Sequence, residues 1–371
     1  MCWAGHCYLN TLSLVVCIAI SCIPQFGMML HDIVIRVHTG DMENLVRQMV
    51  ITIALFFVNI KLFLTLLRKK EMKSIFEHIN ADYKMFNQLP EEYQLIVAET
   101  IAKTQKLETI WTVMLGSAAA SFPILALVMT VYSQFTDEPR LYMVHETILP
   151  FIDHKKYTSP YFEIIAVYSL HIVWLIFVGF TGYDGIFSVC ILHVSLKIKL
   201  YSHKLRHLMD DPDIEVIKRK IETIVKEQCE VFIKEIQTSF EIWLAGIFII
   251  SVIQTGMALS QTTAKGTIYY MFAAATTVHI YLPCHLTSDV TSTAAQVADQ
   301  VYSCGWETLP APALRRSLLI MLARAQLPTY FRAYDMLTFN MEMFVSVITL
   351  LPSPNWTMHL IIDTCFTLKI C

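Results

Sequence analysis

Two charged side chains interrupt the long apolar stretches of this sequence, and they are the first candidates for chemistry. Lys61 lies in the apolar run 48–67, and Asp184 lies in the segment Thr181-Gly-Tyr-Asp-Gly185. Charges inside a membrane are costly and commonly mark ion or proton pathways. We expect Lys61, near one end of its run, to extend its long side chain to the membrane surface. The pattern therefore disfavours a proton relay, and it leaves open a hydrogen-bond network around Asp184.

Histidine is the next residue type that could supply chemistry. His171, His193, His279 and His285 fall on two apolar segments, and no pair has the i, i+4 spacing of a metal site on one helix. The sequence also has no glycine-rich phosphate loop, nucleophile elbow or paired carboxylates. It predicts no metal, no organic cofactor and no enzyme activity.

The composition indicates what kind of protein must position these residues. Of 371 residues, 55% are hydrophobic and only 16% are charged, whereas about 25% are charged in a soluble domain. The net charge of −3 gives no general attraction to nucleic acid. We therefore expect a membrane protein with no nucleic-acid partner.

Apolar runs of membrane-spanning length set the expected elements, since about 20 residues of helix cross a bilayer. Six runs meet this length, and a seventh is interrupted near Pro328. We expect an all-α protein with seven transmembrane helices in a single domain, 1–371. The expected helices cover residues 8–35, 45–68, 109–134, 161–205, 238–262, 267–300 and 313–351, the last divided into 313–327 and 339–351.

Basic residues predict the orientation, because cytoplasmic connections carry the excess of Lys and Arg. They concentrate in the connections after the second, fourth and sixth runs. The N-terminus is then cytoplasmic and the C-terminus extracellular, opposite to a G-protein-coupled receptor. The long inner connections show helical periodicity, as in Ile214, Ile217 and Ile221, which predicts a cytoplasmic helical anchor region.

A series of short motifs lies near the C-terminus. They are Tyr302-Ser-Cys-Gly-Trp306, Leu309-Pro310, Arg315-Arg316, Met321-Leu-Ala-Arg-Ala-Gln326, Pro328 and Met341-Glu-Met-Phe344. An outer-loop sequence reads Leu149-Pro150-Phe151, followed by Ser159-Pro160-Tyr161. Together these motifs resemble the signature of the insect odorant receptor family. The co-receptor subunit of that family has a much longer connection between the fourth and fifth helices, so this chain looks like the ligand-tuning type of subunit.

The resemblance implies a receptor in the plasma membrane of olfactory sensory neurons that binds a small volatile organic ligand. It further implies a heterotetramer with a co-receptor subunit around an odour-gated, non-selective cation pore lined by the second half of the seventh helix. Basic residues such as Arg315, Arg316 and Arg324 could contact membrane lipid.

An odorant pocket needs apolar walls and one or two polar groups, and we expect it in the outer half of the second, third, fourth and sixth helices. The alternative for each aromatic candidate is packing or a place in the interfacial belt. The candidates are Phe57, Ser121, Phe122, Tyr168, His171, Tyr269, Tyr270 and Phe272.

The last helix carries the pore candidates. Met341, Val345 and Ile348 share one helical face and are expected to face the pore or lie near its gate. Alternatively, this face packs on a neighbouring helix. Pro352 and Pro354 interrupt the helix that the family resemblance implies, which leaves open a non-conducting receptor isoform with an altered pore helix.

The sequence also leaves open a second function and contains one candidate modification site. A multispan small-molecule transporter is the alternative function, although the sequence displays no evident pair of buried charges. Asn355, in Asn355-Trp-Thr357, is the one glycosylation sequon, and the expected orientation places it outside the cell.

Overall fold

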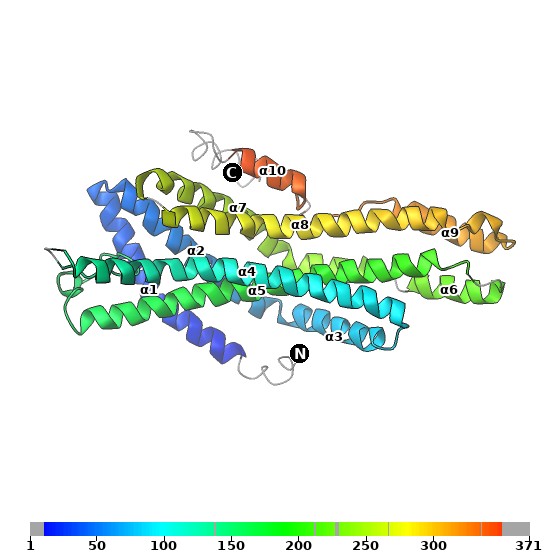
Figure 1. The fold of residues 1–371 in the computed structure, drawn as a ribbon, viewed down its shortest axis with the longest axis horizontal. Coiled ribbons are helices and arrows are strands. Elements are labelled where there is room, and N and C mark those ends of the chain that lie inside the picture. Colours follow the sequence, from blue (N-terminus) through cyan, green and yellow to red (C-terminus); the bar gives the residue numbers. More distant parts are fainter. Residues whose placement is uncertain are drawn as a thin grey trace.

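The fold is an elongated bundle of long helices (Figure 1). The computed structural model describes residues 11–136, 139–210, 213–226, 230–265, 267–334 and 336–350. The long helices are α1 (Thr11–Thr39), α2 (Met42–Leu67), α4 (Glu91–Ser133), α5 (Tyr161–Arg206), α7 (Glu230–Lys265) and α8 (Thr267–Ser303). The short ones are α3 (Lys69–Phe86), α6 (Ile214–Lys226), α9 (Pro312–Ala325) and α10 (Met341–Leu350).

The connections alternate between the two ends of the bundle. The α1–α2 turn, the loop 134–160 and the α7–α8 connection lie at one end, on the left of Figure 1, and α3–α4, α5–α6 and α8–α9 lie at the other. The loop contains a 3-10 turn, Asp153–Lys155, and a second such turn, Trp306–Thr308, precedes α9. Neighbouring long helices are therefore antiparallel, as a chain that crosses a membrane repeatedly requires.

Five helices are long and apolar enough to cross a membrane within the described residues. These candidate spans are Ile20–Thr39, Asn44–Leu67, Glu91–Ser133, Tyr161–Arg206 and Phe232–Leu259. The chain is thus an all-helical, multispan membrane protein, while the seven-span count and the orientation of the termini stay predictions.

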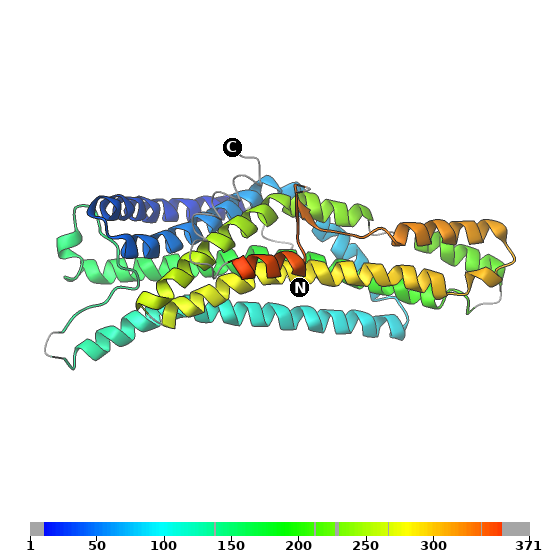
Figure 2. The same cartoon turned by 90° about the horizontal axis from the view of Figure 1, so that it is seen from above.

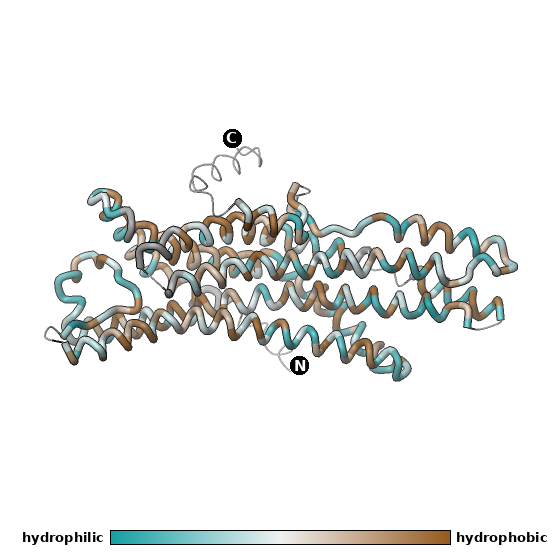
Figure 3. The backbone as a smooth tube through the Cα atoms, turned by 45° about the horizontal axis from the view of Figure 1, so that its top comes forward, coloured by the Kyte–Doolittle hydropathy of each residue, from teal (hydrophilic) through white to brown (hydrophobic). Residues whose placement is uncertain are grey.

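Two of these helices are much longer than a membrane is thick. α4 has 43 residues and α5 has 46, so each is roughly 65 Å long. The third helix, expected from residue 109, begins at Glu91, and the fifth, expected from residue 238, begins at Glu230. The added turns carry polar residues towards the end of the bundle that holds α6 and α9. Figure 3 shows more hydrophilic colour there than in the middle of the bundle. This extension fits the anchor region that the sequence predicted.

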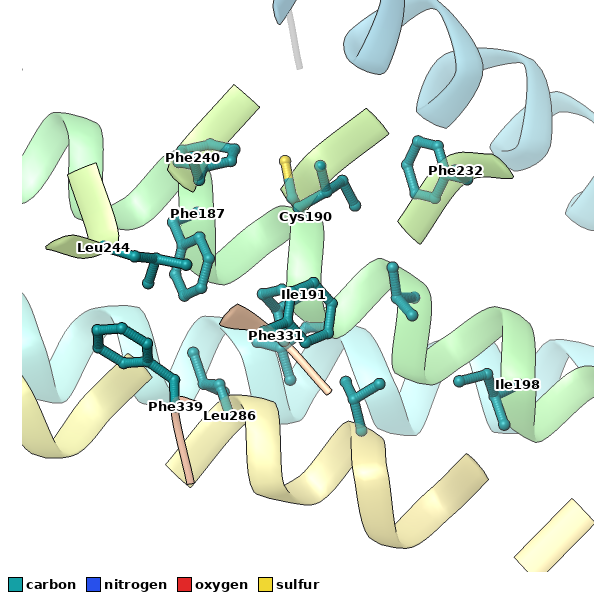
Figure 4. Packing of buried hydrophobic residues seen from close by; sticks show 14 of the residues in the cluster. Phe187, Cys190, Ile191, Ile198, Phe232, Phe240, Leu244, Leu286, Phe331 and Phe339 are labelled. Carbon is teal, nitrogen blue, oxygen red and sulfur yellow. The ribbon is translucent and has the colours of Figure 1, made fainter. Parts of the chain in front are cut away.

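The core centres on the middle of α5. Nearly every side chain from Phe187 to Leu196 is buried, so this stretch is covered on all sides. Figure 4 shows Phe187, Cys190 and Ile191 of α5 packed among residues of α7, α8 and the segment after α9. That central position makes α5 the helix against which the others are placed.

The chain between α9 and α10 is held against α8. Its strands β1 (Arg332–Ala333) and β2 (Leu337–Thr338) pair antiparallel. The hydroxyl of Thr287 donates to the Phe339 carbonyl at 2.8 Å, and the Met341 N–H donates to Ser288 at 3.0 Å. Figure 2 shows α10 lying along α8 as a result. The two halves expected for the last helix are thus α9 and α10, separated by this hairpin.

α2 and α5 cross closely at a glycine. A Cβ atom added to Gly179 would lie 2.5 Å from Cγ1 of Val58, a distance that forces movement of a buried β-branched side chain. Gly182, one turn later, has nothing within 4 Å of its added Cβ. Only the first glycine is required by packing.

We predict opposite effects of alanine at these two glycines. Gly179→Ala should destabilise the protein by about 1–3 kcal/mol through overpacking. Gly182→Ala should be neutral or stabilise by up to about 1 kcal/mol, because alanine favours helix. Thermal unfolding of the detergent-solubilised chain measures both. Equal melting temperatures for the two variants would contradict this packing. Adding Val58→Ala to Gly179→Ala should restore part of the lost stability, because it removes the side chain that the new methyl group meets.

Candidate ligand-binding site

An apolar cavity of about 100 Å³ lies between the helices, towards the end of the bundle that carries the loop 134–160. α4 and α5 supply half of its lining residues, and α1, α2, α7, α8 and the loop supply the rest. Its apolar lining is Met29, Ile51, Ala54, Trp111, Leu115, Ala118, Ala119, Phe122, Val144, Ile172, Val173, Ile176, Phe177, Phe180, Phe272 and Ala275. A lining of this kind suits a small, uncharged, largely hydrophobic molecule.

The polar side chains of the lining are few, and most are engaged by the protein itself. The Gln254 amide donates to the Val50 carbonyl at 3.2 Å. The Thr276 hydroxyl lies 2.9 Å from that of Thr255. These bonds hold α7 against α2 and α8, so the two side chains shape the cavity more than they offer hydrogen bonds to a ligand.

Trp111 and His279 form the floor of the cavity. Their rings are stacked, with centroids 5.6 Å apart and an interplanar angle of 12°. The Nδ1 atom of His279 lies 3.0 Å from the Ser251 hydroxyl, and its Nε2 atom lies 2.9 Å from Oδ2 of Asp184. The imidazole is therefore fixed on both sides, with one face presented to Trp111.

A buried ion pair lies directly beneath this floor. Lys61 Nζ is 2.6 Å from Oδ1 of Asp184, and the two side chains are only 1% and 4% exposed. The ammonium also lies 4.1 Å from the ring centroid of Phe180, which lines the cavity. A single aromatic layer, Phe180 and His279, thus separates the cavity from a charged network.

This network corrects two sequence-based expectations. The expectation that Lys61 extends to the membrane surface is wrong, because its ammonium is enclosed and paired. The sequence displayed no pair of buried charges, yet the fold forms one between α2 and α5. The possible hydrogen-bond network around Asp184 is present, with Lys61 and His279 as its members.

The loop 134–160 covers the outer end of the cavity and is held there by a buried aspartate. Asp32 of α1 accepts a hydrogen bond from the Ile148 N–H at 2.8 Å and one from Arg36 at 2.7 Å. On the other side, Arg47 reaches the Glu146 carbonyl at 3.4 Å. These bonds hold the segment that directly follows Val144 and His145, which line the cavity from above.

His145 is a polar lining residue with an unpaired ring nitrogen. Its Nε2 atom is shielded from solvent, and no described residue bonds to it. Burial, reinforced by the charges of Arg47 and Arg36, lowers the pKa of His145 to about 3. The imidazole is therefore neutral at physiological pH and can offer one hydrogen bond without bringing a charge to the cavity.

The structure brings together some of the predicted ligand residues. Phe122 and Phe272 line the cavity in an edge-to-face pair with centroids 6.4 Å apart. Phe57 is fully buried behind the wall, against Phe180 and His279. The Ser121 hydroxyl donates to the carbonyl of Ala118 in its own helix. For Phe57 and Ser121 a ligand role stays a prediction.

The other predicted ligand residues lie elsewhere. The Tyr168 hydroxyl donates to the Ser21 carbonyl at 2.6 Å, and the ring borders a second cavity described below. His171 and Tyr270 are exposed. The side chain of Tyr269 is outside the described part of the structure.

The structure describes the pore candidates, which lie on α10, but not the sequon. On α10, Met341 and Ile348 pack against the core, whereas Val345 is 54% exposed. Asn355 lies outside the described residues. The pore and glycosylation assignments stay predictions.

Sequence reasoning missed Trp111, His145, Phe177, Phe180 and His279 as parts of the site. Val173, Phe177 and Phe180 recur at helical spacing, which is a visible but common signal. His145 belongs to a loop, and no local pattern indicates that the loop folds over the helices. Among the described residues, no cluster of His, Cys, Asp and Glu could hold a metal ion.

Comparisons with known proteins give a consistent result. A sequence model described as "7tm Odorant receptor" matches residues 41–351. The chain is similar to a structure of the insect olfactory receptor OR5 from Machilis hrabei, with 13% identity and a TM-score of 0.69, over 94% of this chain and 88% of that one. For the same receptor in complex with eugenol, identity is 13% and the TM-score 0.76, over 100% and 93%. No curated protein matches the sequence.

The buried charges yield a first prediction for this site. Lys61→Met should destabilise the protein by about 3–5 kcal/mol, because it leaves the Asp184 carboxylate buried with only His279 beside it. Asp184→Leu should cost a similar amount, and Lys61→Met combined with Asp184→Leu should cost much less than the sum. The free energies of unfolding of the two single variants and the double variant, measured in detergent, test this coupling. If the cost of the double variant equals the sum of the single costs, the two residues do not depend on each other.

His145 yields a second prediction. In the unfolded chain, His145 gains a proton as the pH falls below about 6.5. In the folded chain, its imidazole stays neutral down to about pH 3. The residue therefore lowers stability as pH falls through that window and has no such effect above it. Replacing it removes this loss, so the melting temperature should fall less between about pH 7.5 and 5 in His145→Gln than in the wild type.

The matched control is His154→Gln, because His154 is exposed on the same loop and does not line the cavity. It should keep the wild-type pH dependence. A His145→Gln variant as sensitive to acid as the wild type would show that His145 titrates normally in the folded chain.

Proposed function

Because the chain belongs to the 7tm odorant receptor family, we propose that it recognises small volatile organic molecules in the cavity above Trp111 and His279. The protein is a membrane-spanning receptor of this family and not an enzyme.

The observation that carries the proposal is the apolar cavity itself. Its walls are mostly aromatic and aliphatic, and its polar groups include a neutral imidazole. Volatile molecules are small and uncharged. Burying one in such a site therefore brings in no charge that the protein would have to neutralise. The similar Machilis hrabei receptor is in complex with eugenol, which supports the same class of ligand here.

We propose that the receptor acts with a co-receptor subunit in a heterotetrameric, odour-gated cation channel of the plasma membrane of olfactory sensory neurons. α10 supplies the pore candidates. Val345 is exposed on this helix and so is free to face a neighbouring subunit or the pore, while Met341 and Ile348 pack inward near the proposed gate. Membrane lipid covers the exposed apolar faces of α1, α4 and α5.

A small-molecule transporter is the second candidate, and the Lys61–Asp184 pair is the observation that favours it. Buried charge pairs in membranes often serve ion-coupled transport. Saturable uptake of a volatile probe without current would support that function, and current without uptake would exclude it.

The test of the proposed function is whole-cell current during exposure to a panel of volatile compounds, with and without the co-receptor. An odour-evoked cation current that requires both subunits supports the proposal. Silence at confirmed surface expression, with current restored by a family-like continuation after Ile348, identifies the non-conducting isoform. Silence with either ending gives the channel role no support.

Filling the cavity gives a specific prediction. Ala118 lines the cavity and is 6% exposed, whereas its neighbour Ser117 is exposed and absent from the lining. Ala118→Phe should reduce the response to an active odorant by about tenfold or more, because the added ring occupies the ligand volume. Ser117→Phe should respond like the wild type. Equal responses of the two variants at equal surface expression would contradict this site.

A further inference from the structure

A second cavity lies beside the first, under the loop 134–160. Its volume is about 290 Å³, and it lies between the middle of α1, the first turns of α5 and the loop. Its own lining is Pro24, Met28, Met143, Thr147, Leu149, Ile152, Ile164, Ile165 and Tyr168.

The two cavities meet at three polar side chains. Gln25 of α1, His145 of the loop and Ser169 of α5 line both of them. Gln25 is 6% exposed. No other described residue is shared between the two linings. These three side chains therefore stand between the two cavities, and a molecule that moved from one to the other at this boundary would contact them.

The outer wall of the second cavity reaches the surface of the bundle. Ile164 is 62% exposed, and Pro24 is exposed on the facing side of α1. Ile23 and Val167, beside these two residues, are also more than half exposed and apolar. This surface is of the kind that lipid covers, and apolar molecules concentrate in lipid.

We propose that the second cavity is the entrance chamber of the ligand site, and that Gln25, His145 and Ser169 form a polar filter favouring neutral molecules with one hydroxyl group. The inference rests on the proposed function, since it concerns access to the same site. It adds a route, from the membrane between α1 and α5, and a chemical class of ligand, small aromatic alcohols.

The hydroxyl preference follows from His145. Its Nε2 atom is buried and meets no partner in the described chain, so a ligand that bonds to it removes an existing penalty. A hydroxyl group can donate or accept, and it therefore suits either tautomer of a neutral imidazole. A hydrocarbon leaves the atom unsatisfied, and an ammonium ion loses its hydration in an apolar cavity.

The first experiment measures binding without relying on channel activity. The full chain is purified in detergent, and benzyl alcohol and toluene are titrated while tryptophan fluorescence is recorded, since Trp111 lies in the cavity floor. The wild type should bind benzyl alcohol about tenfold more tightly than toluene, as one neutral hydrogen bond allows. His145→Ala should abolish this preference and retain toluene binding. His154→Ala, on the same loop and outside both linings, should keep it.

The outcomes separate the filter from the proposed function. If both probes bind and His145→Ala keeps the preference for the alcohol, the filter is overturned and the ligand site stands. If the wild type binds neither probe, the site and the filter fall together. Because the His145→Ala comparison is a ratio of two affinities in one variant, a partial loss of folded protein does not change it.

The second experiment tests the route. Ile165 lines only the entrance chamber, and Val167, on the same turn of α5, is exposed outside it. Ile165→Phe should slow association and dissociation of benzyl alcohol by the same factor and leave Kd unchanged, because it obstructs passage and does not touch the ligand. Val167→Phe should have wild-type rates. Unchanged rates in Ile165→Phe, or a change in Kd alone, would overturn the route.

A volume-conserving variant controls for effects other than obstruction. Ile165→Met keeps the side-chain volume close to the native one and should keep the wild-type rates. Rates slowed equally in Ile165→Met and Ile165→Phe would show that obstruction is not the cause and would overturn the route.

Discussion

The enclosed charge network of Lys61, Asp184 and His279 constrains the rest of the structure. Its members come from α2, α5 and α8, and each would be costly to bury alone. Satisfying them together fixes the relative position of three helices at one level of the bundle. That level is the floor of the ligand cavity, so the stability of the fold and the shape of the site depend on the same contacts.

The candidate site is built outward from this floor in layers. Phe180 and His279 separate the charges from the cavity, and aromatic residues of α4, α5 and α8 form much of its wall. Asp32 holds the loop above, which carries His145 with its unpaired Nε2 atom. Charge is thus kept at the floor and in the surrounding ion pairs. The space between offers mainly apolar contact, with a few neutral polar side chains.

The same helix that lines the cavity also supports the proposed pore element. α8 carries Phe272 and His279 at the site, and about two turns beyond His279 its Thr287 and Ser288 bond the start of α10. Tyr281 of α8 also packs edge-to-face on Phe344 of α10, with centroids 5.2 Å apart. A continuous series of contacts therefore joins the cavity to α10 along one helix, α8, which contains Pro283 between His279 and Thr287.

The sequence by itself determined that the chain is helical and spans the membrane repeatedly, because apolar runs of sufficient length are a local property. Its motifs indicated the family, and it identified Phe122 and Phe272 as cavity residues. Only the tertiary structure decided that Lys61 pairs with Asp184, that Tyr168 borders a different cavity, and that a loop supplies His145. The reason is that lipid and protein interior are both apolar, so a membrane helix carries little periodicity to show which face is turned inward. Contacts between residues 123 positions apart leave no local trace in the sequence at all.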